Sequence, residues 1–283
     1  MRRRAPLRPL EQLNRGSAGE VTVGRLEALI WDVDGTLAET ERDGHRVAFN
    51  RAFEEAGLAW RWDDAHYAEL LRITGGRERL LHDMSRRSDA PVPAGEREAL
   101  ARAIHRRKNA IYADLVASGC IALRDGVQGL MQECRERGVW MGIATTTSRA
   151  NVDALLRVHL GERWREGFAA IVCGEDVQRK KPDPEVYVQA LRALGVGALQ
   201  AVAIEDSPGG VVAARGADIP VIVTRSAYFA NASIEGALAI GPGLHQRQGW
   251  SPALPVAPGA AGPVTLDDIL DWLAQRETVS QFM

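Results

Sequence analysis

The sequence predicts an α/β protein, in which a Rossmann-like parallel sheet forms the core and a second domain made of helices is inserted into it. Short apolar runs, each followed by a turn and a helical pattern, recur along most of the chain. Such alternation is typical of βα units in a parallel sheet that is buried on both faces. One long stretch, residues 44–118, has helical patterns and no convincing strand. A chain of 283 residues is long enough for such a core and insert.

The first expected strand is Leu26–Trp31, which runs directly into Asp32. The later strands are expected at Val139–Thr145, Ala169–Cys173, Gln200–Ile204 and Pro220–Val223. Amphipathic segments between them predict helices at Gly126–Arg137, Asn151–Val158 and Pro184–Leu194. Because crossovers in parallel sheets are right-handed, we expect the site where the carboxyl ends of the strands meet.

The insert contains four expected helices, at His45–Gly57, Asp64–Ile73, Glu78–Ser85 and Gly95–Ser118. We therefore divide the chain into a core, residues 26–43 and 119–283, and a helical cap, residues 44–118.

Residues 1–25 are expected to be a disordered extension. They carry several arginines but lack the apolar stretch of a secretory signal. An organellar transit peptide is the alternative, and Glu11 and Glu20 argue against it. Near the other end, the Gly- and Pro-rich residues 239–264 predict a long mobile surface segment. Thr265–Leu273 predicts a closing helix with Thr265 as its N-cap.

The composition excludes several classes of protein. A net charge of −2 gives no basic surplus for binding nucleic acid. No apolar run approaches the ~18 residues of a membrane span. Cys120, Cys134 and Cys173 form neither a zinc pattern nor a disulfide framework, which is typical of a reducing compartment. We expect a cytoplasmic protein, a monomer or a weak dimer, whose partner is a small molecule.

The segment Asp32-Val33-Asp34-Gly35-Thr36 follows the first expected strand directly. Two carboxylates two residues apart can point to the same side of an extended chain. A divalent cation is the usual compensation for such charge, because hard cations prefer oxygen ligands. A helix N-terminus with incidental acids is the alternative, and the spacing alone does not decide between them.

Three further groups follow later expected strands. Glu205-Asp206 supplies a second acidic pair, Thr145–Ser148 supplies hydroxyl groups before a helix, and Lys180-Lys181 supplies a cation. Taken singly, the hydroxyl groups are explained by helix capping and the lysines by a solvated loop. Carboxylates, an anion site and a lysine at the ends of strands of one sheet together indicate phosphoryl transfer.

With these motifs in order, the chain from residue 26 to 223 resembles the haloacid dehalogenase superfamily of phosphotransferases. The motifs that carry the resemblance are Asp32–Thr36, Thr145, Lys181 and Glu205-Asp206. The resemblance implies a C1-type cap for the helical insert. It also implies that Asp32 is the nucleophile and Asp34 the general acid and base, and that Thr145 and Lys181 bind the phosphoryl oxygens.

The same resemblance implies a Mg²⁺ ion as cofactor. Asp32, the main-chain carbonyl of Asp34 and Asp206 would hold it, with Glu205 in or near the first ligand shell. The first step requires a protonated Asp34, and we expect a shielded site near an ionised Asp32 to favour that form.

Within the superfamily, the chain is similar to CbbY-type sugar-bisphosphate phosphatases. The stretches that carry this are Ala38–Asn50, Thr74–Glu78 and Thr145–Val152. Glu39 stands where the wider subfamily more often has Asp, which points to the CbbY-type group. Such proteins dephosphorylate xylulose 1,5-bisphosphate, an inhibitory by-product of the Calvin cycle enzyme Rubisco, and the resemblance implies that substrate here.

A bisphosphate needs a second anion site in the cap. Arg77, after Gly75 and Gly76, is the first choice, with a solvated helix-start arginine as the alternative. Lys108 is the second, with an ordinary basic helix face as the alternative. Lesser candidates for contact with the substrate are His45, Gly76, Thr146, Thr147 and Arg149.

Two other functions stay open at this point. A mutase similar to β-phosphoglucomutase would use the same phosphorylated aspartate but return the phosphoryl group to the sugar. A non-catalytic phosphosugar-binding protein would keep the fold, although it would be expected to lack a motif residue and none is missing.

Overall fold

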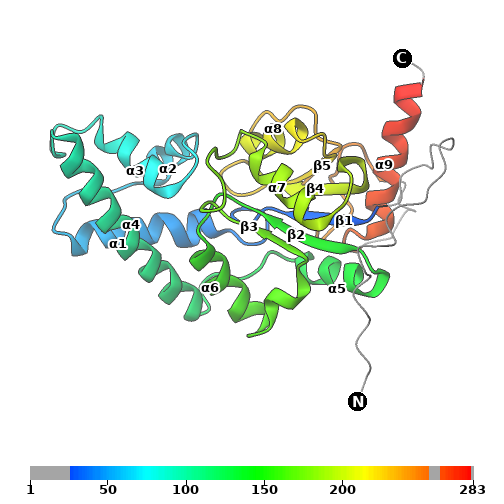
Figure 1. The fold of residues 1–283 in the computed structure, drawn as a ribbon, viewed down its shortest axis with the longest axis horizontal. Helices are drawn as coiled ribbons and strands as arrows, with labels where there is room; N and C mark the ends of the chain where they lie inside the picture. The colour runs from blue at the N-terminus through cyan, green and yellow to red at the C-terminus, as the bar shows by residue number, and fades with distance from the viewer. Residues whose placement is uncertain (1–25, 255–261, 282–283) are drawn as a thin grey trace.

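A computed structural model describes residues 26–254 and 262–281 of the chain. Within them, six parallel strands form one sheet in the order β3-β2-β1-β4-β5-β6 (Figure 1). Their bounds are Ala28–Trp31 (β1), Trp140–Ala144 (β2), Ala170–Val172 (β3), Ala201–Glu205 (β4), Val221–Thr224 (β5) and Ala239–Gly241 (β6). Because β1 pairs with both β2 and β4, the segment that follows it lies at the middle of the sheet's carboxyl edge.

Helices cover both faces of the sheet, which explains the uninterrupted apolar runs of the strands. The helices are Val127–Arg137 (α5), Arg149–Leu160 (α6), Glu185–Leu194 (α7), Pro208–Gly216 (α8) and Leu266–Gln281 (α9). Alternate residues of β1 serve the two faces: Leu29 packs in the core shared with α5, α6 and α9, and Ile30 in the core shared with α7 and α8. Short 3-10 turns at Trp164–Gly167 and Ala198–Gln200 precede β3 and β4.

The cap lies beside the core at the end of the sheet where the strands finish (Figure 1). It begins with a π-helical turn, Glu41–His45, and continues as α1 (Arg46–Glu55), α2 (Asp64–Leu70), α3 (Gly76–Met84) and α4 (Ala94–Ala117). The aromatic rings of Phe49, Phe53 and Tyr67 surround Trp62 at the centre of these helices. The predicted boundary at residue 44 falls inside the first helical turn.

The five strands expected from the sequence are confirmed to within a residue or two at each end. The other expected helices are confirmed to within about three residues, but the closing helix, expected to end at Leu273, continues to Gln281. The expectation of a mobile surface segment after Ala239 is wrong for residues 239–254. Ala239–Gly241 pairs with β5, and Leu244 and Trp250 are buried. Gly241 resembles a chain breaker in the sequence, but a side chain there would lie 2.1 Å from the ring of Trp250.

Several smaller expectations are also decided. Thr265 accepts a hydrogen bond from the amide of Asp268 at 3.4 Å, as an N-cap should. The three cysteines are free. No helix in the described part of the chain is long and apolar enough to cross a membrane. The predictions for residues 1–25 and 255–261 lie outside the described residues.

The aromatic cluster predicts where the cap derives its stability. Trp62 is fully buried, and its Nε1 donates to Asp83 at 2.8 Å. Trp62→Ala should therefore lower the free energy of unfolding by roughly 3–5 kcal/mol, the usual cost of removing a buried aromatic side chain. Urea unfolding followed by circular dichroism measures it.

Trp140→Ala is the matched control, because Trp140 is 50% exposed at the start of β2. We expect that change to cost less than about 1 kcal/mol. Equal decreases in the free energy of unfolding of the two variants would contradict the assignment of Trp62 to the centre of the cap.

Candidate active site

A cavity of about 760 Å³ lies between the cap and the carboxyl edge of the sheet. Its walls come from both domains, with Asp32, Thr145 and Asp206 on the core side and Gly76 and Lys108 on the cap side. The sheet order explains the core side, because β1, β2 and β4 are neighbours and each ends in one of the predicted motifs.

Asp32, Lys181 and Glu205 form a buried ionic group at the floor of the cavity. Lys181 Nζ donates to Asp32 Oδ1 at 2.5 Å, to Glu205 Oε1 at 2.6 Å and to the carbonyl of Ala144 at 2.9 Å. Glu205 also accepts a hydrogen bond from the hydroxyl of Tyr187 at 2.6 Å. These three acceptors hold the ammonium beside Asp32.

Burial shapes the charge state of this group. It raises the pKa of Asp32 to about 8, with the charge of Glu205 adding to the rise and Lys181 opposing it. Burial alone would lower the pKa of Lys181, but the charges of Asp32 and Glu205 outweigh it and raise that pKa. Lys181 is therefore a stable ammonium at neutral pH.

The acidic groups of the site fit a divalent cation. Ligand atoms of Asp32, Glu205 and Asp206 all lie within 4.8 Å of one another. Burial, together with the charges of Asp32 and Glu205, raises the pKa of Asp206 well above its usual range. The raised pKa values of Asp32 and Asp206 show that ionising all three carboxylates needs more positive charge than Lys181 supplies. A divalent cation would supply it, and carboxylate oxygens are the ligands that Mg²⁺ prefers.

The three carboxylates of this cluster have different contacts, and these contacts suit them to different roles. Glu205 is fully buried and its Oε1 is occupied by Lys181 and Tyr187, so its evident function here is to hold the lysine. Asp206 Oδ2 accepts from Ser226 at 2.5 Å. Gly35 packs against Asp206 so closely that a side chain at Gly35 would lie 2.0 Å from Oδ2. Asp32 and Asp206 are therefore the carboxylates best placed to hold a metal.

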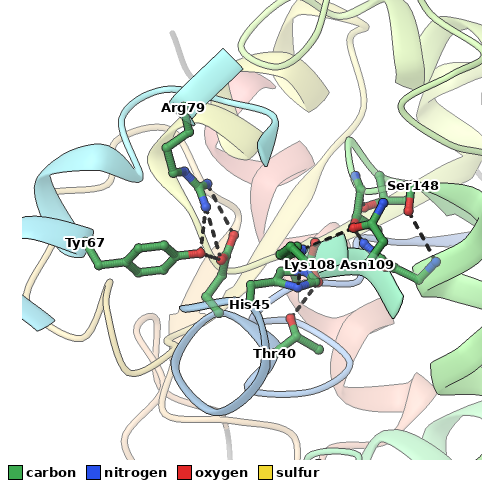
Figure 2. Close-up of polar contacts among 12 residues, drawn as sticks. Thr40, His45, Tyr67, Arg79, Lys108, Asn109 and Ser148 are labelled. Carbon is green, nitrogen blue, oxygen red and sulfur yellow. Dashed lines mark hydrogen bonds and ion pairs between the residues drawn. The ribbon is translucent and has the colours of Figure 1, made fainter. Parts of the chain in front are cut away.

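Asp34 points toward residues 37–45, the linker that leads from the end of β1 through the π-helical turn into α1 of the cap. Thr40 Oγ1 donates to Asp34 Oδ1 at 2.6 Å, and His45 Nε2 lies 3.0 Å from the same oxygen. Lys108 Nζ of α4 lies 2.8 Å from His45 Nδ1, which extends this chain of contacts into the cap (Figure 2). Sequence reasoning gave His45 only a minor role and missed Thr40, although Thr40 follows the first motif closely in the chain.

Without substrate, the surroundings of Asp34 do not favour the protonated form that the first step requires. Burial would raise the pKa of Asp34, but the attraction and hydrogen bond of His45, the hydrogen bond of Thr40 and the charge of Lys108 together hold it well below its usual range. Burial also lowers the pKa of Lys108 to about 8. Asp34 is thus ionised before substrate arrives, because its cationic and hydrogen-bonding neighbours favour the carboxylate.

The hydroxyl groups after β2 form one wall of the cavity. Thr145, Thr146, Thr147 and Ser148 all line it. Ser148 is also the N-cap of α6, so capping and cavity lining both apply to this segment. Asn151, which sequence reasoning missed, is buried, lines the cavity and donates to Thr147 at 3.1 Å.

Of the other residues predicted to contact the substrate, some line the cavity and one does not. Gly76 and Arg77 line the cavity, but the guanidinium of Arg77 pairs with Glu98 at 2.9 Å. Arg149 is absent from the described residues that line the cavity, and it pairs instead with Asp176.

The structure adds two ion pairs in the cavity wall that the sequence did not indicate. Lys180, next to Lys181, pairs with Glu78 of α3 at 2.9 Å and so joins core to cap. Arg79 of α3 donates to the hydroxyl of Tyr67 at 2.7 Å and pairs with Glu41 of the linker at 3.3 Å (Figure 2). Charged residues at helix starts are common on surfaces, so the sequence carried no signal that separated these from solvated ones.

Known proteins match this chain over most of its length. A family model of haloacid dehalogenase-like hydrolases matches residues 26–218. The plasmid-borne protein CbbY of Cupriavidus necator is 44% identical over 239 residues, which cover 83% of this chain and 92% of that protein. A crystal structure of a CbbY mutant from Rhodobacter sphaeroides in complex with xylulose-(1,5)bisphosphate superimposes with a TM-score of 0.70 at 42% identity, covering 75% of this chain and 92% of that one.

The shared ammonium yields a prediction about stability. Lys181→Met removes the ammonium from between Asp32 and Glu205 and leaves the fully buried Glu205 without its ion-pair partner. The free energy of unfolding, measured with urea at neutral pH without divalent metal, should fall by roughly 3–5 kcal/mol.

Lys180→Met is the matched control, because Lys180 makes a partly exposed pair with Glu78. Its loss should be at most about 1 kcal/mol. A Lys181→Met protein as stable as the Lys180→Met protein would show that Lys181 does not compensate the buried carboxylates.

Proposed function

This chain belongs to the haloacid dehalogenase-like hydrolases and is a CbbY-type phosphatase of that family, and from this premise we propose that it is a Mg²⁺-dependent phosphatase of xylulose 1,5-bisphosphate. The observation that carries the proposal is the Asp32–Lys181 pair at the floor of a cavity that the cap closes. The xylulose-bisphosphate complex of the Rhodobacter sphaeroides CbbY mutant supports the substrate.

The first step transfers the phosphoryl group to Asp32. A carboxylate is repelled by an anionic phosphate, and Lys181 reduces that repulsion from a fixed position 2.5 Å from the nucleophile. The hydroxyl of Thr145 and main-chain amides of the turn between β2 and α6 bind the phosphoryl oxygens. The P–O bond to the sugar breaks as the bond to Asp32 forms, which leaves an aspartyl phosphate.

Asp34 handles the proton in both steps. The incoming phosphate adds negative charge close to Asp34 and so raises its pKa on binding. Asp34 then takes up a proton from the solvent and donates it to the departing sugar oxygen. Once ionised again, Asp34 accepts a proton from the water that attacks the aspartyl phosphate. Thr40 and His45 hold its carboxylate in place through both steps.

Asp32, Asp206 and the carbonyl of Asp34 are the groups that would hold Mg²⁺, while Glu205 keeps Lys181 beside them. When bound, the ion supplies positive charge that offsets the negative charge of the transferring phosphoryl group. We also propose that the protein works in the cytoplasm as a monomer or weak dimer, removing a by-product of carbon fixation.

Asp32→Asn should abolish phosphate release while leaving the thermal unfolding transition in place, because the amide keeps the shape of the side chain but is not a nucleophile. Phosphate release from xylulose 1,5-bisphosphate with Mg²⁺ measures the activity, with ribulose 1,5-bisphosphate and glucose phosphates for comparison. The wild-type protein should prefer xylulose 1,5-bisphosphate.

Isomerised sugar phosphate in place of free phosphate would identify a mutase instead. The absence of both products from every sugar phosphate would favour a binding protein. Turnover by the Asp32→Asn protein would exclude Asp32 as the nucleophile.

Arg77 remains our candidate for the distal phosphate, which would draw its guanidinium away from Glu98. Arg77→Ala should then raise KM for the bisphosphate by about tenfold, since a charge-assisted hydrogen bond contributes about 1.5–3 kcal/mol. KM for a sugar monophosphate should change little.

Arg102→Ala is the matched control, because Arg102 pairs with the same Glu98 at 3.0 Å from an exposed position. It should leave both KM values unchanged. Equal effects of Arg77→Ala on bisphosphate and monophosphate would remove Arg77 from the distal site.

A further inference from the structure

Arg124 lies where the chain returns from the cap to the core. Its main-chain amide donates to the carbonyl of Leu37 at 2.8 Å, and the preceding Leu123 forms an antiparallel bridge with Ala38. The outgoing and returning linkers of the cap are therefore joined at this point, directly after the catalytic turn Asp32–Thr36.

The side chain of Arg124 reaches three loops at the carboxyl edge of the sheet. Nη1 donates to the carbonyl of Gly35, and to the carbonyl and hydroxyl of Thr224 at 3.1 Å each. Nη2 donates to the carbonyls of Arg225 at 2.7 Å and Pro242 at 3.2 Å. These acceptors follow or end β1, β5 and β6, so one guanidinium ties three separate loops together.

Two of these acceptors are next to groups that place the metal-binding carboxylates. Gly35 follows Asp34 in the chain and packs against Asp206. Arg225 precedes Ser226, whose hydroxyl donates to Asp206 at 2.5 Å. A shift of either loop would therefore move the carboxylate of Asp206 or the carbonyl of Asp34.

From this arrangement, and resting on the proposed function, we propose that Arg124 is a positioning residue for the reaction. It fixes the catalytic turn and Asp206 relative to the linkers of the cap. Arg124 does not touch the cavity and acts only through the carbonyls that it holds.

The electrostatics of Arg124 agree with this role. Its Nε lies 3.8 Å from Glu39, whose carboxylate also accepts from the amide of Ala227 at 3.2 Å. Burial lowers the pKa of Arg124, while Glu39 and Asp206 oppose that change. A guanidinium has five donors in a rigid plane, whereas a lysine has three on a flexible stem. Lysine can therefore replace only part of this function.

The experiment compares Arg124→Met and Arg124→Lys with the wild-type protein in three measurements: kcat and KM for phosphate release, the Kd for Mg²⁺ by calorimetry without substrate, and the thermal unfolding midpoint. Arg124→Met should lower kcat and weaken Mg²⁺ binding by about tenfold or more, because small misplacements of catalytic groups have large effects on rate. KM should change less than about threefold. The kcat and the Kd for Mg²⁺ of Arg124→Lys should lie between those of the wild-type protein and those of Arg124→Met.

Arg247→Met is the control for a merely structural role. Arg247 is held by Asp268 at 2.8 Å and Thr265 at 3.3 Å beside α9, away from the cavity. It should lower the unfolding midpoint without changing kcat or the Kd for Mg²⁺. If Arg124→Met does not fold, Arg124→Lys carries the same comparison.

Two results would overturn the proposal. The first is that the Arg124 variants bind Mg²⁺ and release phosphate as well as the wild-type protein does. The second is that their losses of kcat and of Mg²⁺ affinity are no larger than those of an equally destabilised Arg247→Met protein. If the wild-type protein itself releases no phosphate, the proposed function fails, whereas calorimetry with Mg²⁺ still decides the role of Arg124.

Discussion

The site depends on one ammonium shared between buried carboxylates. Lys181 contacts both Asp32 and Glu205, and without it two acidic side chains would be buried together at the carboxyl edge of the sheet. Burial of unpaired charge costs several kcal/mol, so the position of Lys181 is as important for the fold as for the reaction. The parallel sheet makes the arrangement possible, because β1, β2 and β4 are adjacent and end at the same edge.

The cap adds the groups that the core lacks. Its linker carries Thr40 and His45 to Asp34, and its long helix α4 carries Lys108 to His45. The aromatic cluster around Trp62 and the Glu41–Arg79 ion pair bind the cap helices and the linker to one another. Changes in cap position should therefore occur mainly at the linkers, which meet at the Ala38–Leu123 bridge.

The main residues of this site could be predicted from the sequence because most of them lie next to the end of an expected strand. Asp32, Thr145 and Glu205 each end or follow an apolar run, and parallel strands bring such ends to one edge of the sheet. Lys181 lies in the loop after β3 and was identified by its order among the motifs. β6 was missed because Gly241 looks like a chain breaker, whereas the absence of its side chain makes room for Trp250. Other contacts could not be predicted because they join residues distant in the chain, which no local pattern specifies. They are the ion pairs of Arg77 with Glu98 and of Arg149 with Asp176, and the hydrogen bonds of Arg124 to three loops.

We propose that Asp32, held by Lys181, receives the phosphoryl group. Rapid acid quenching of wild-type protein and Mg²⁺ with phosphate-labelled xylulose 1,5-bisphosphate, followed by peptide mass spectrometry, tests it directly. We expect a transient label on the peptide that carries Asp32, located at that residue and formed before free phosphate accumulates. Phosphate release with no label on the protein at any time, or a label on a residue other than Asp32, would contradict it.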